Sequence, residues 1–507
     1  MAKNTAKVTV NVINKAQSTN TPPLGIAFVI GETERGIPND PSVLITSVAQ
    51  YEKHFGGIQA DNDFSLMAEQ AILGGASLRV CRVVSQSAYG AAYDVRTDHG
   101  DLLFSLYTKG TGLYYSDPSK FIVTITLDPS TSANGYFNLT IQDVDAGITE
   151  TYTQLKYQKL DSGQTYMKPV IDASQLVTVT YSSSSSATGA VDEGVVPVGT
   201  AGHNGDAPVI ADYQGNSANK TGLYAFNEFD DGNILSPLYY NPHITLAAMY
   251  GAGKAYAEAR KDLVFIDHIL NSIDASGDIA TALSSLTASK YAMVLVGGVQ
   301  VNDTINGGLK NMLGTGMALG AIATSQNNYG PWYSPTAFTR GLLPAALGVV
   351  NNFGSPASQG EREIIANAGG SCIVNKRQQV MLWDAYTMAL ANSPEKFFSI
   401  VQLEIYMVKV LKPLLEFYLG SPNIWNTWER IYYAVLPFLN SLVNDEAIYS
   451  YKWSGDQFAT SLDDLQINDA SDVGKGIYKV QLQFKAVVPI VDVTLNIVLT
   501  ETSVEFS

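Results

Sequence analysis

Cysteine, histidine and charged residues are all scarce in this chain, and each scarcity excludes a class of function. The two cysteines, Cys81 and Cys372, lie far apart among apolar residues, so they form no metal or redox motif and are expected as buried thiols. Five histidines are scattered without a His-x-x-x-His pair, which leaves a zinc site unsupported. Only 15% of residues are charged, with 31 basic against 47 acidic side chains and no basic run, so direct nucleic-acid binding is not expected.

Long apolar runs are missing as well. No stretch approaches the ~20 apolar residues of a membrane span, and no apolar run follows the first lysines, where a signal peptide would have one. We therefore expect synthesis in the cytoplasm and no membrane insertion. The 507 residues are 46% apolar, which is enough to bury large cores, and are too many for one core, so we expect several domains.

The motifs of catalysis and nucleotide binding are incomplete. Gly251 to Lys254 looks like the end of a phosphate-binding loop, but Ala248 and Ala255 stand where that motif needs glycine and Ser/Thr. Asp267-His268 ends a buried strand, where such a pair is more often a polar cluster or a helix cap than a catalytic pair. We therefore predict a protein that is not an enzyme and holds no cofactor or metal. The alternative, a hydrolase or nucleotide-binding enzyme on an α/β core, rests on this pair alone.

Both ends of the chain alternate apolar and polar residues, as strands do. The alternation covers residues 7–13, 478–485 and 491–497, and a polar arm follows the first of these up to residue 20. A short strand on a polar tether is not stable alone, so it needs the edge of a sheet, on its own chain or on a neighbour. The apolar positions expected to form the strand contacts are Val8, Val10, Val12, Val480, Leu482, Phe484, Val493, Leu495 and Ile497.

The order of predicted strands and helices between the two ends, together with local composition, predicts the domain organisation. After the arm, residues 1–20, strands and helices alternate in residues 21–95 and again in 206–380, as in a discontinuous α/β core. Residues 96–205 are rich in Thr, Ser, Tyr and Val and contain a serine run, so we expect a β-rich insertion that faces outward. Residues 381–507 are expected to form a C-terminal α+β domain.

Three helices carry prolines that bear on where they end. Two long amphipathic helices are predicted over residues 395–419 and 423–443, and Pro413 and Pro437 should kink or end them. Residues 341–350 are also predicted as a helix, in spite of an internal proline. An acidic loop and the terminal strands follow the second long helix.

The surroundings of two arginines and two tryptophans can be predicted from their positions in a strand and a helix. Arg79 and Arg82 flank a predicted strand, a position where arginines are usually surface or interface residues. Trp425 and Trp428 have helical spacing, which places them in the core rather than on a ligand platform.

An ordered series of motifs runs through the first α/β segment. It comprises Gly25 to Gly31, Gly36-Ile37-Pro38, Phe55-Gly56-Gly57, Gly74-Gly75 and Leu78 to Val83. The series resembles the N-terminal region of the contractile tail sheath proteins of bacteriophages and related injection systems. The segment from Gly330 to Pro335 is similar to a second motif of that family, although Phe338 stands where an asparagine is typical. The C-terminal order of long helices, acidic loop and paired strands is a third similarity.

The resemblance implies a structural subunit that polymerises helically around an inner tail tube and contracts to drive the tube through the host envelope for genome ejection. The alternative within the family is the sheath of a bacterial contractile injection device of the tailocin type. Implied partners are other copies of the chain, the inner tube protein, and baseplate and tail terminator proteins, and the implied location is the virion tail.

For the C-terminal domain, the resemblance implies a position facing the tube and a sheet completed by strands exchanged between subunits. We expect Lys409 or Lys412 to touch the tube. A third class of function, a surface adhesin, is suggested by the Tyr/Ser/Thr-rich insertion.

Overall fold

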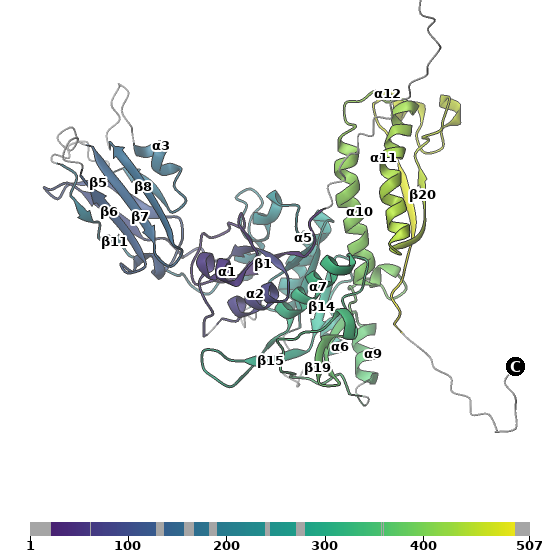
Figure 1. Ribbon diagram of the computed structural model, residues 1–507, viewed down its shortest axis with the longest axis horizontal. Coiled ribbons are helices and arrows are strands. Elements are labelled where there is room, and N and C mark those ends of the chain that lie inside the picture. The colour runs from purple at the N-terminus through teal and green to yellow at the C-terminus, as the bar shows by residue number, and fades with distance from the viewer. Residues whose placement is uncertain are drawn as a thin grey trace, which may run out of the picture. The chain divides into compact units, whose positions relative to one another are not determined.

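The protein consists of two compact units. The computed structural model describes residues 22–60, 62–127, 136–156, 167–181, 190–238, 244–269, 279–355, 357 and 359–491. The larger unit is Pro23–Ile405, and the C-terminal unit begins at Tyr406. Five sheets and helices of very different lengths occur in these residues, which confirms the expected mixed α/β, multidomain architecture (Figure 1).

An eight-stranded sheet forms the centre of the larger unit. Its strands are β1 (Ile26–Gly31), β2 (Leu44–Ile45), β3 (Ser77–Arg82), β12 (Ile234–Ser236), β13 (Val264–His268), β14 (Ala292–Val296), β18 (Gly370–Lys376) and β19 (Gln379–Leu382). Their order is β19-β18-β14-β13-β12-β1-β3-β2, and only the edge strands β2 and β19 run antiparallel to their neighbours. All six residues of β1 are buried, as expected for a parallel sheet that is covered on both faces.

Helices cover the two faces of this sheet. One face packs against α1 (Val48–Phe55), α2 (Phe64–Leu73) and α7 (Thr315–Tyr329). A Cβ on Gly320 of α7 would lie 2.7 Å from the Cα of Gly74, so these glycines allow α2 and α7 to approach closely. The other face packs against α5 (Leu246–Arg260), α6 (Ile279–Ser284) and α9 (Gln359–Asn367). Cys81 and Cys372 are free and buried in these cores, as predicted.

A β-sandwich is inserted between β3 and β12. Its first sheet has the order β10-β6-β7-β8 and its second the order β11-β4-β5-β9, and all pairs are antiparallel. The strands are β4 (Ala92–Arg96), β5 (Leu102–Thr108), β6 (Phe121–Thr126), β7 (Phe137–Asp143), β8 (Ile148–Leu155), β9 (Val177–Tyr181), β10 (Gly194–Val195) and β11 (Val198–Thr200). Alternate residues of both sheets form one apolar core, which makes the sandwich a separate packing unit.

The chain enters and leaves the sandwich side by side. Tyr89 and His203 form an antiparallel bridge, in which the Tyr89 amide donates to the His203 carbonyl (3.1 Å) and the His203 amide donates back (2.9 Å). Their rings stack with centroids 5.6 Å apart. The two connections to the core therefore run as one paired ribbon.

One buried arginine of the core holds the sandwich in place. Arg35, in the loop after β1, donates from Nη1 to the hydroxyl of Tyr114 (2.5 Å) and from Nη2 to the carbonyl of Glu52 (2.6 Å). The Tyr114 hydroxyl donates in turn to Asp143 Oδ1 (2.7 Å), which lies 3.6 Å from Arg35 Nη1. Arg35 is 4% exposed and Asp143 also 4%, so this ion pair joins core and insertion away from water.

A second arginine at the same joint corrects an expectation. Arg82 at the end of β3 is 3% exposed, not a surface residue, and Arg79 is partly buried. Arg82 Nη1 donates to the carbonyl oxygens of Gly36 (2.8 Å) and Thr111 (3.1 Å), and Nε donates to that of Thr33 (3.3 Å). These partners are backbone atoms from distant segments, which strand spacing does not reveal.

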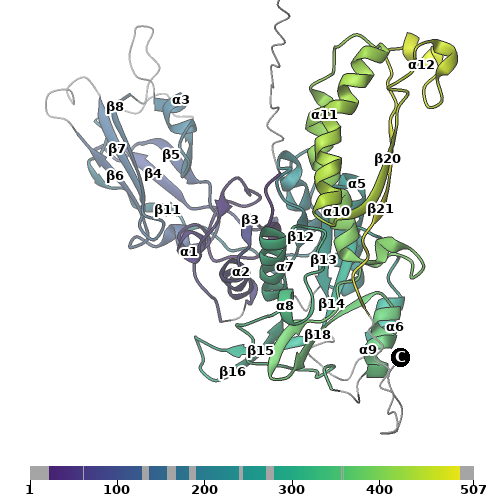
Figure 2. The ribbon, with the colours of Figure 1, turned by 45° about the vertical axis from the view of Figure 1, so that its right-hand side comes forward.

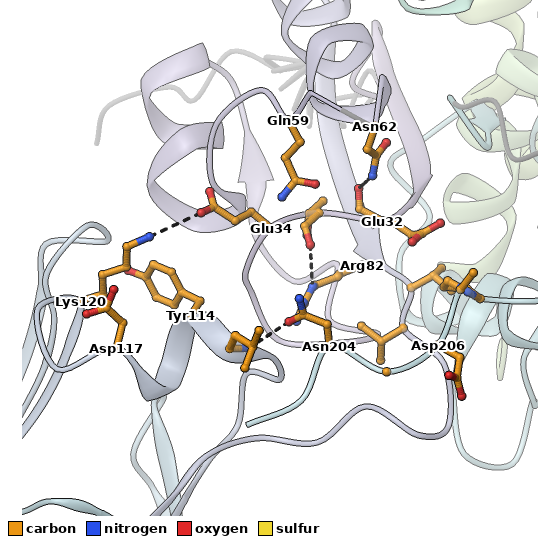
Figure 3. A pocket seen from close by; sticks show the side chains of 17 residues that line it. Glu32, Glu34, Gln59, Asn62, Arg82, Tyr114, Asp117, Lys120, Asn204 and Asp206 are labelled. Carbon is orange, nitrogen blue, oxygen red and sulfur yellow. Dashed lines mark hydrogen bonds and ion pairs between the residues drawn. The ribbon is translucent and has the colours of Figure 1, made fainter. Parts of the chain in front are cut away.

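A cavity of about 570 Å³ lies beside this joint (Figure 3). Core residues such as Glu34 line it on one side, and Lys120 of the sandwich lines it on the other. Lys120 Nζ lies 3.7 Å from Glu34 Oε1, with both side chains about one third exposed. This outer pair is therefore solvent-screened, unlike the pair made by Arg35.

The predicted helix over residues 341–350 is wrong. A short helix, α8 (Ala337–Arg340), ends before it, and the segment continues to β17 (Gly348–Val349). Pro344 explains the break, because it removes a backbone donor and clashes with the preceding turn. β17 pairs with a hairpin of β15 (Gly298–Asn302) and β16 (Leu309–Leu313).

Two long helices and two strands form the C-terminal part. The long helices are α10 (Phe398–Glu416), which begins in the larger unit, and α11 (Trp425–Asn444), and the strands are β20 (Ile448–Ser454) and β21 (Gln481–Ala486) (Figures 1 and 2). A short helix, α12 (Ala470–Gly474), lies between the two strands in sequence. Pro413 and Pro437 lie inside α10 and α11, and neither ends its helix. Around Pro437, burial of Val435, Phe438 and Leu439 outweighs one lost hydrogen bond. Trp428 is 1% exposed, as expected for the core, whereas Trp425 is 41% exposed.

The described residues contain neither a membrane-spanning helix nor a cluster of metal ligands. None of their helices is both long and apolar enough to cross a membrane. Within the same residues, no three His, Cys, Asp or Glu side chains come together as a metal ion would require.

We expect Arg35→Met to lower the free energy of unfolding by about 3–5 kcal/mol, because Asp143 would stay buried without its cation. Lys120→Met is the matched control at the same joint, and its exposed pair should contribute less than about 1 kcal/mol. Urea titration of both variants measures the two losses, and losses of equal size would contradict this account of the joint.

Candidate assembly edge in the C-terminal unit

Two strands of the C-terminal unit present one apolar and one polar face. β20 and β21 pair antiparallel, with Tyr451 opposite Phe484 and Trp453 opposite Leu482. Trp453 is 7% exposed, and β20 contacts α11, which identifies this face as the inner one (Figure 2). The other face carries polar pairs such as Lys452 with Gln483 and faces water.

The outer edges of this strand pair are open. Within the described part of the chain, β20 and β21 form a sheet of only two strands. Each strand therefore has one row of backbone N–H and C=O groups that faces no other strand. A two-stranded ribbon is marginally stable by itself, and an added strand would pair those groups and extend the apolar face.

One carboxylate orders the long segment between β20 and β21. Asp456 accepts the backbone N–H groups of Gln466 (2.8 Å), Ile467 (3.0 Å) and Asn468 (2.7 Å). Asn468 then binds the backbone of Lys479 on both sides, donating to its carbonyl (3.0 Å) and accepting from its amide (2.7 Å). These bonds set the point at which β21 begins.

An aromatic contact fastens the same point to α11. The rings of Tyr478 and Trp428 stack with centroids 4.9 Å apart and planes 11° apart. Trp428 Nε1 donates to Asn423 Oδ1 (2.8 Å), and Asn423 Nδ2 donates to the carbonyl of Ile477 (3.1 Å). β21 is therefore presented on a rigid support rather than on a loose tail.

The structure describes only part of the predicted strand-exchange set. Val480, Leu482 and Phe484 lie at or in β21, each half-buried between exposed neighbours, which agrees with the predicted alternation. The residues of the two outer segments lie outside the described residues: Val8, Val10, Val12, Val493, Leu495 and Ile497.

Sequence reasoning missed β20, the strand that pairs with β21 in the same chain. The signal was present, because Tyr449, Tyr451 and Trp453 recur at a period of two in a stretch rich in strand-forming residues. The pairing occupies one edge of β21 and leaves the other open.

The two lysines predicted to touch a tube lie in the second half of α10. Lys409 is half-buried, whereas the side chain of Lys412 is 72% exposed and its Nζ lies 4.0 Å from Glu416 Oε1. An exposed pair of this kind contributes little to stability, so the Lys412 charge is available to a partner at small cost.

Exposed apolar side chains are concentrated in the C-terminal unit. Among the described residues, 27 large apolar side chains are exposed, and 14 of them lie in residues 406–491. Phe417 and Leu419 at the end of α10 are 72% and 79% exposed, and Ile490 is 84% exposed. A surface with this composition is typical of an interface that is buried in an assembly.

The one candidate catalytic pair is enclosed. Asp267 and His268 at the end of β13 are 7% and 2% exposed, and His268 Nδ1 lies 3.0 Å from the hydroxyl of Thr315. Burial raises the pKa of Asp267 to about 7 and lowers that of His268 to about 3. Both groups are therefore largely neutral near pH 6, as a polar cluster in a core requires.

Solved structures of tail sheath proteins have the same fold as this chain. The sheath tail protein of Listeria innocua covers 92% of this chain and 95% of its own, with 10% identity and a TM-score of 0.56. The sheath tail protein of Desulfitobacterium hafniense covers 89% and 94%, with 13% identity and a TM-score of 0.52.

The protein of a contracted helical sheath also has a fold similar to that of this chain. The helical sheath of the anti-feeding prophage in its contracted state covers 98% of this chain and 99% of its own, with 12% identity and a TM-score of 0.56. No family model and no curated protein matches this chain. The resemblance to tail sheath proteins is thus confirmed at the level of the fold, at identities of 10–13%.

We expect Asp267→Asn to change how stability depends on pH. The raised pKa of Asp267 stabilises the fold below about pH 4, and that contribution is lost as the pH rises through about 7. Asparagine does not titrate, so the variant does not lose this contribution. Between pH 4 and 8, its free energy of unfolding should therefore rise relative to that of the wild type by about 1.4 kcal/mol for each pKa unit of the shift.

Urea titrations at pH 4, 6 and 8 measure the effect. Asp303→Asn is the control, because backbone N–H donors lower the pKa of that exposed carboxyl and its contribution has the opposite sign. A constant difference between Asp267→Asn and the wild type across this range would refute the burial argument.

Proposed function

We propose that this protein is a subunit of a contractile tail sheath, which polymerises helically around an inner tail tube and contracts to drive that tube through a cell envelope. The observation that carries the proposal is the likeness to the contracted anti-feeding prophage sheath along nearly the full length of both chains. Because one fold can host several functions, the open strand edges and exposed apolar residues of the C-terminal unit are needed as independent support.

In this proposal, strands from neighbouring subunits complete the C-terminal sheet. Residues 7–13 of one subunit pair with β21 and with the 491–499 region of other subunits. Backbone hydrogen bonds provide the affinity, and alternate side chains provide the register. The arm of ~20 residues reaches about 65 Å when extended, at ~3.3 Å per residue, which is enough to cross to an adjacent subunit.

Such contacts join two different patches, so they propagate as an open helix instead of closing a ring. A polar tether allows subunits to rotate as rigid bodies while the paired strands stay together. The exposed apolar side chains of residues 406–491 become buried between subunits, and additional burial on contraction supplies the driving free energy at about 25 cal/mol per Å². Nucleotide hydrolysis is not needed for this mechanism.

The proposal also assigns partners and a location. The second half of α10, with Lys409 and Lys412, faces the inner tube protein, and the ends of the sheath meet baseplate and tail terminator proteins. In a bacteriophage the protein lies in the virion tail, is made in the host cytoplasm and serves genome ejection. In a bacterial injection device of the tailocin type, the same subunit serves a tube that carries no genome. The likeness to the anti-feeding prophage sheath fits either setting.

Two other classes make different predictions for the purified protein. An enzyme acting through Asp267 and His268 would remain globular, although their burial leaves a substrate little access. An adhesin would form trimeric fibres that display the sandwich. Electron microscopy separates the classes, because only a sheath subunit forms long striated tubes.

Deletion of residues 1–15 should leave soluble monomers, because the connecting strand is lost while the core is untouched. Val10→Pro should also prevent assembly, because proline removes a backbone donor from the strand ladder. Val10→Thr is the control and should still assemble, because threonine keeps the donor and favours strands. Negative-stain microscopy and sedimentation measure assembly, and full-length sheaths from the truncated chain would show that the arm is not the connector.

The double variant Lys409→Glu/Lys412→Glu should abolish assembly on the inner tube and leave tube-free assembly intact. The control is Lys168→Glu in α3 (Met167–Asp172) of the sandwich, which breaks a comparable i,i+4 ion pair with Asp172 (2.8 Å). Co-sedimentation with purified tubes measures the effect. Unchanged tube-templated assembly in the double variant would remove these lysines from the interface.

A further inference from the structure

Three buried amide side chains meet in the core, and we call them the amide cluster: Asn233 at the start of β12, Gln326 of α7 and Gln402 of α10. They are 5%, 2% and 1% exposed. Asn233 Nδ2 donates to Gln326 Oε1 and to Gln402 Oε1, both at 2.9 Å. Gln402 Nε2 donates to the carbonyl of Asn233 (3.2 Å), and Gln326 Nε2 donates to Gln402 Oε1 (3.3 Å). Three elements that are distant in sequence are thus joined by four directional bonds.

The cluster reaches the root of the N-terminal arm. The amide of Gly25, directly before β1, donates to Gln326 Oε1 (3.3 Å). Gly25 has a φ of +70°, and a Cβ at this position would lie 2.6 Å from Asn327 Nδ2. Only glycine fits here without strain, so the backbone conformation is fixed at the point where β1 begins.

The cluster also holds the start of α10. Gln402 lies near the start of α10, one turn before Tyr406, where the C-terminal unit begins. Lys290, just before β14, adds a second attachment, because its Nζ lies 2.8 Å from Glu395 Oε1 and from Glu404 Oε1. Both connectors that leave the larger unit are therefore anchored in the same part of it.

We infer that the amide cluster couples the root of the N-terminal arm to the start of α10, so that a pull on one connector is delivered to the other. The source of such a pull rests on the proposed function, in which neighbouring subunits hold both connectors. Without the cluster, tension along the arm would act directly on β1 and on its ladders with β12 and β3. The first bond toward β3 is the one that the Ser77 amide donates to the Gly25 carbonyl (2.9 Å). With it, the core turns as one body and the sheet keeps its register.

Amides suit this role better than apolar side chains. Each carries donors and an acceptor, so bonds among three amides specify orientation and distance, whereas apolar contacts permit sliding. Burial makes a broken bond costly, because no water replaces the lost partner. Asn233, Gln326 and Gln402 are accordingly positioning residues that act on Gly25 and α10.

Hydrogen exchange of the monomer tests the coupling. Gln402→Met keeps the size of the side chain and removes its bonds, and we expect exchange at the Gly25 amide to rise about tenfold, the effect of losing roughly one buried hydrogen bond, although Gln402 does not touch Gly25. Leu403→Met is the control, because Leu403 is equally buried in α10 and makes no polar bond to the cluster. Urea titration corrects both rates for global stability.

A double-mutant cycle of Gln326→Met and Gln402→Met should give non-additive exchange rates at Gly25, as expected for residues in one network. Unchanged Gly25 exchange in Gln402→Met, or a rise equal to that in Leu403→Met, would overturn the inference.

Failure of the amide-cluster inference can be distinguished from failure of the proposed function. A wild-type chain that never forms striated tubes contradicts the sheath assignment, whatever the exchange data show. A chain that forms tubes and shows no coupling at Gly25 contradicts the amide cluster alone. In tubes of Gln402→Met, we expect contraction to give a wider spread of helical rotation than in the wild type, measured by electron microscopy.

Discussion

Backbone groups at the edge of a sheet need hydrogen-bond partners, and this constraint governs the C-terminal unit. The described chain provides one partner, β20, for β21 and leaves both outer edges of the pair open. At the same time, several contacts fix the start of β21: hydrogen bonds of Asp456 and Asn468, and the stacked rings of Trp428 and Tyr478. A rigid but incomplete sheet lowers the ordering cost for an incoming strand, which is how preorganisation raises affinity.

Apolar burial and polar contacts have different roles in the larger unit. The eight-stranded sheet owes its stability to helices on both faces, and many substitutions there would be tolerated if volume were kept. The geometry between parts is set instead by a few buried polar groups. Arg35 and Arg82 fix the sandwich to the core, and the amide cluster fixes the roots of the connectors. Such groups specify a single arrangement, because any alternative would leave them unpaired.

The elements predictable from sequence were those with local signals. The run from Ile26 to Gly31 and the spacing of Phe64 to Leu73 identify a buried strand and a helix without further information. Arg82 and Gln402 could not be assigned in this way, because their partners lie far away in sequence or belong to the backbone. β20 lies between these cases, because its alternation is visible in the sequence although no strand was predicted there. For the helices, Pro437 shows that tertiary burial can outweigh a strong local signal.

The bridge between Tyr89 and His203 has a consequence for how this chain can vary. The chain leaves the core and returns to it as neighbouring segments. Within its described residues, the sandwich contributes no strand to the central sheet. Any domain whose two ends lie about 5 Å apart could be carried there as an exchangeable module. What such a module must reproduce is small: a hydroxyl and a carboxylate for Arg35, and a carbonyl for Arg82. The sandwich can therefore diversify in sequence while the central sheet and its covering helices stay the same.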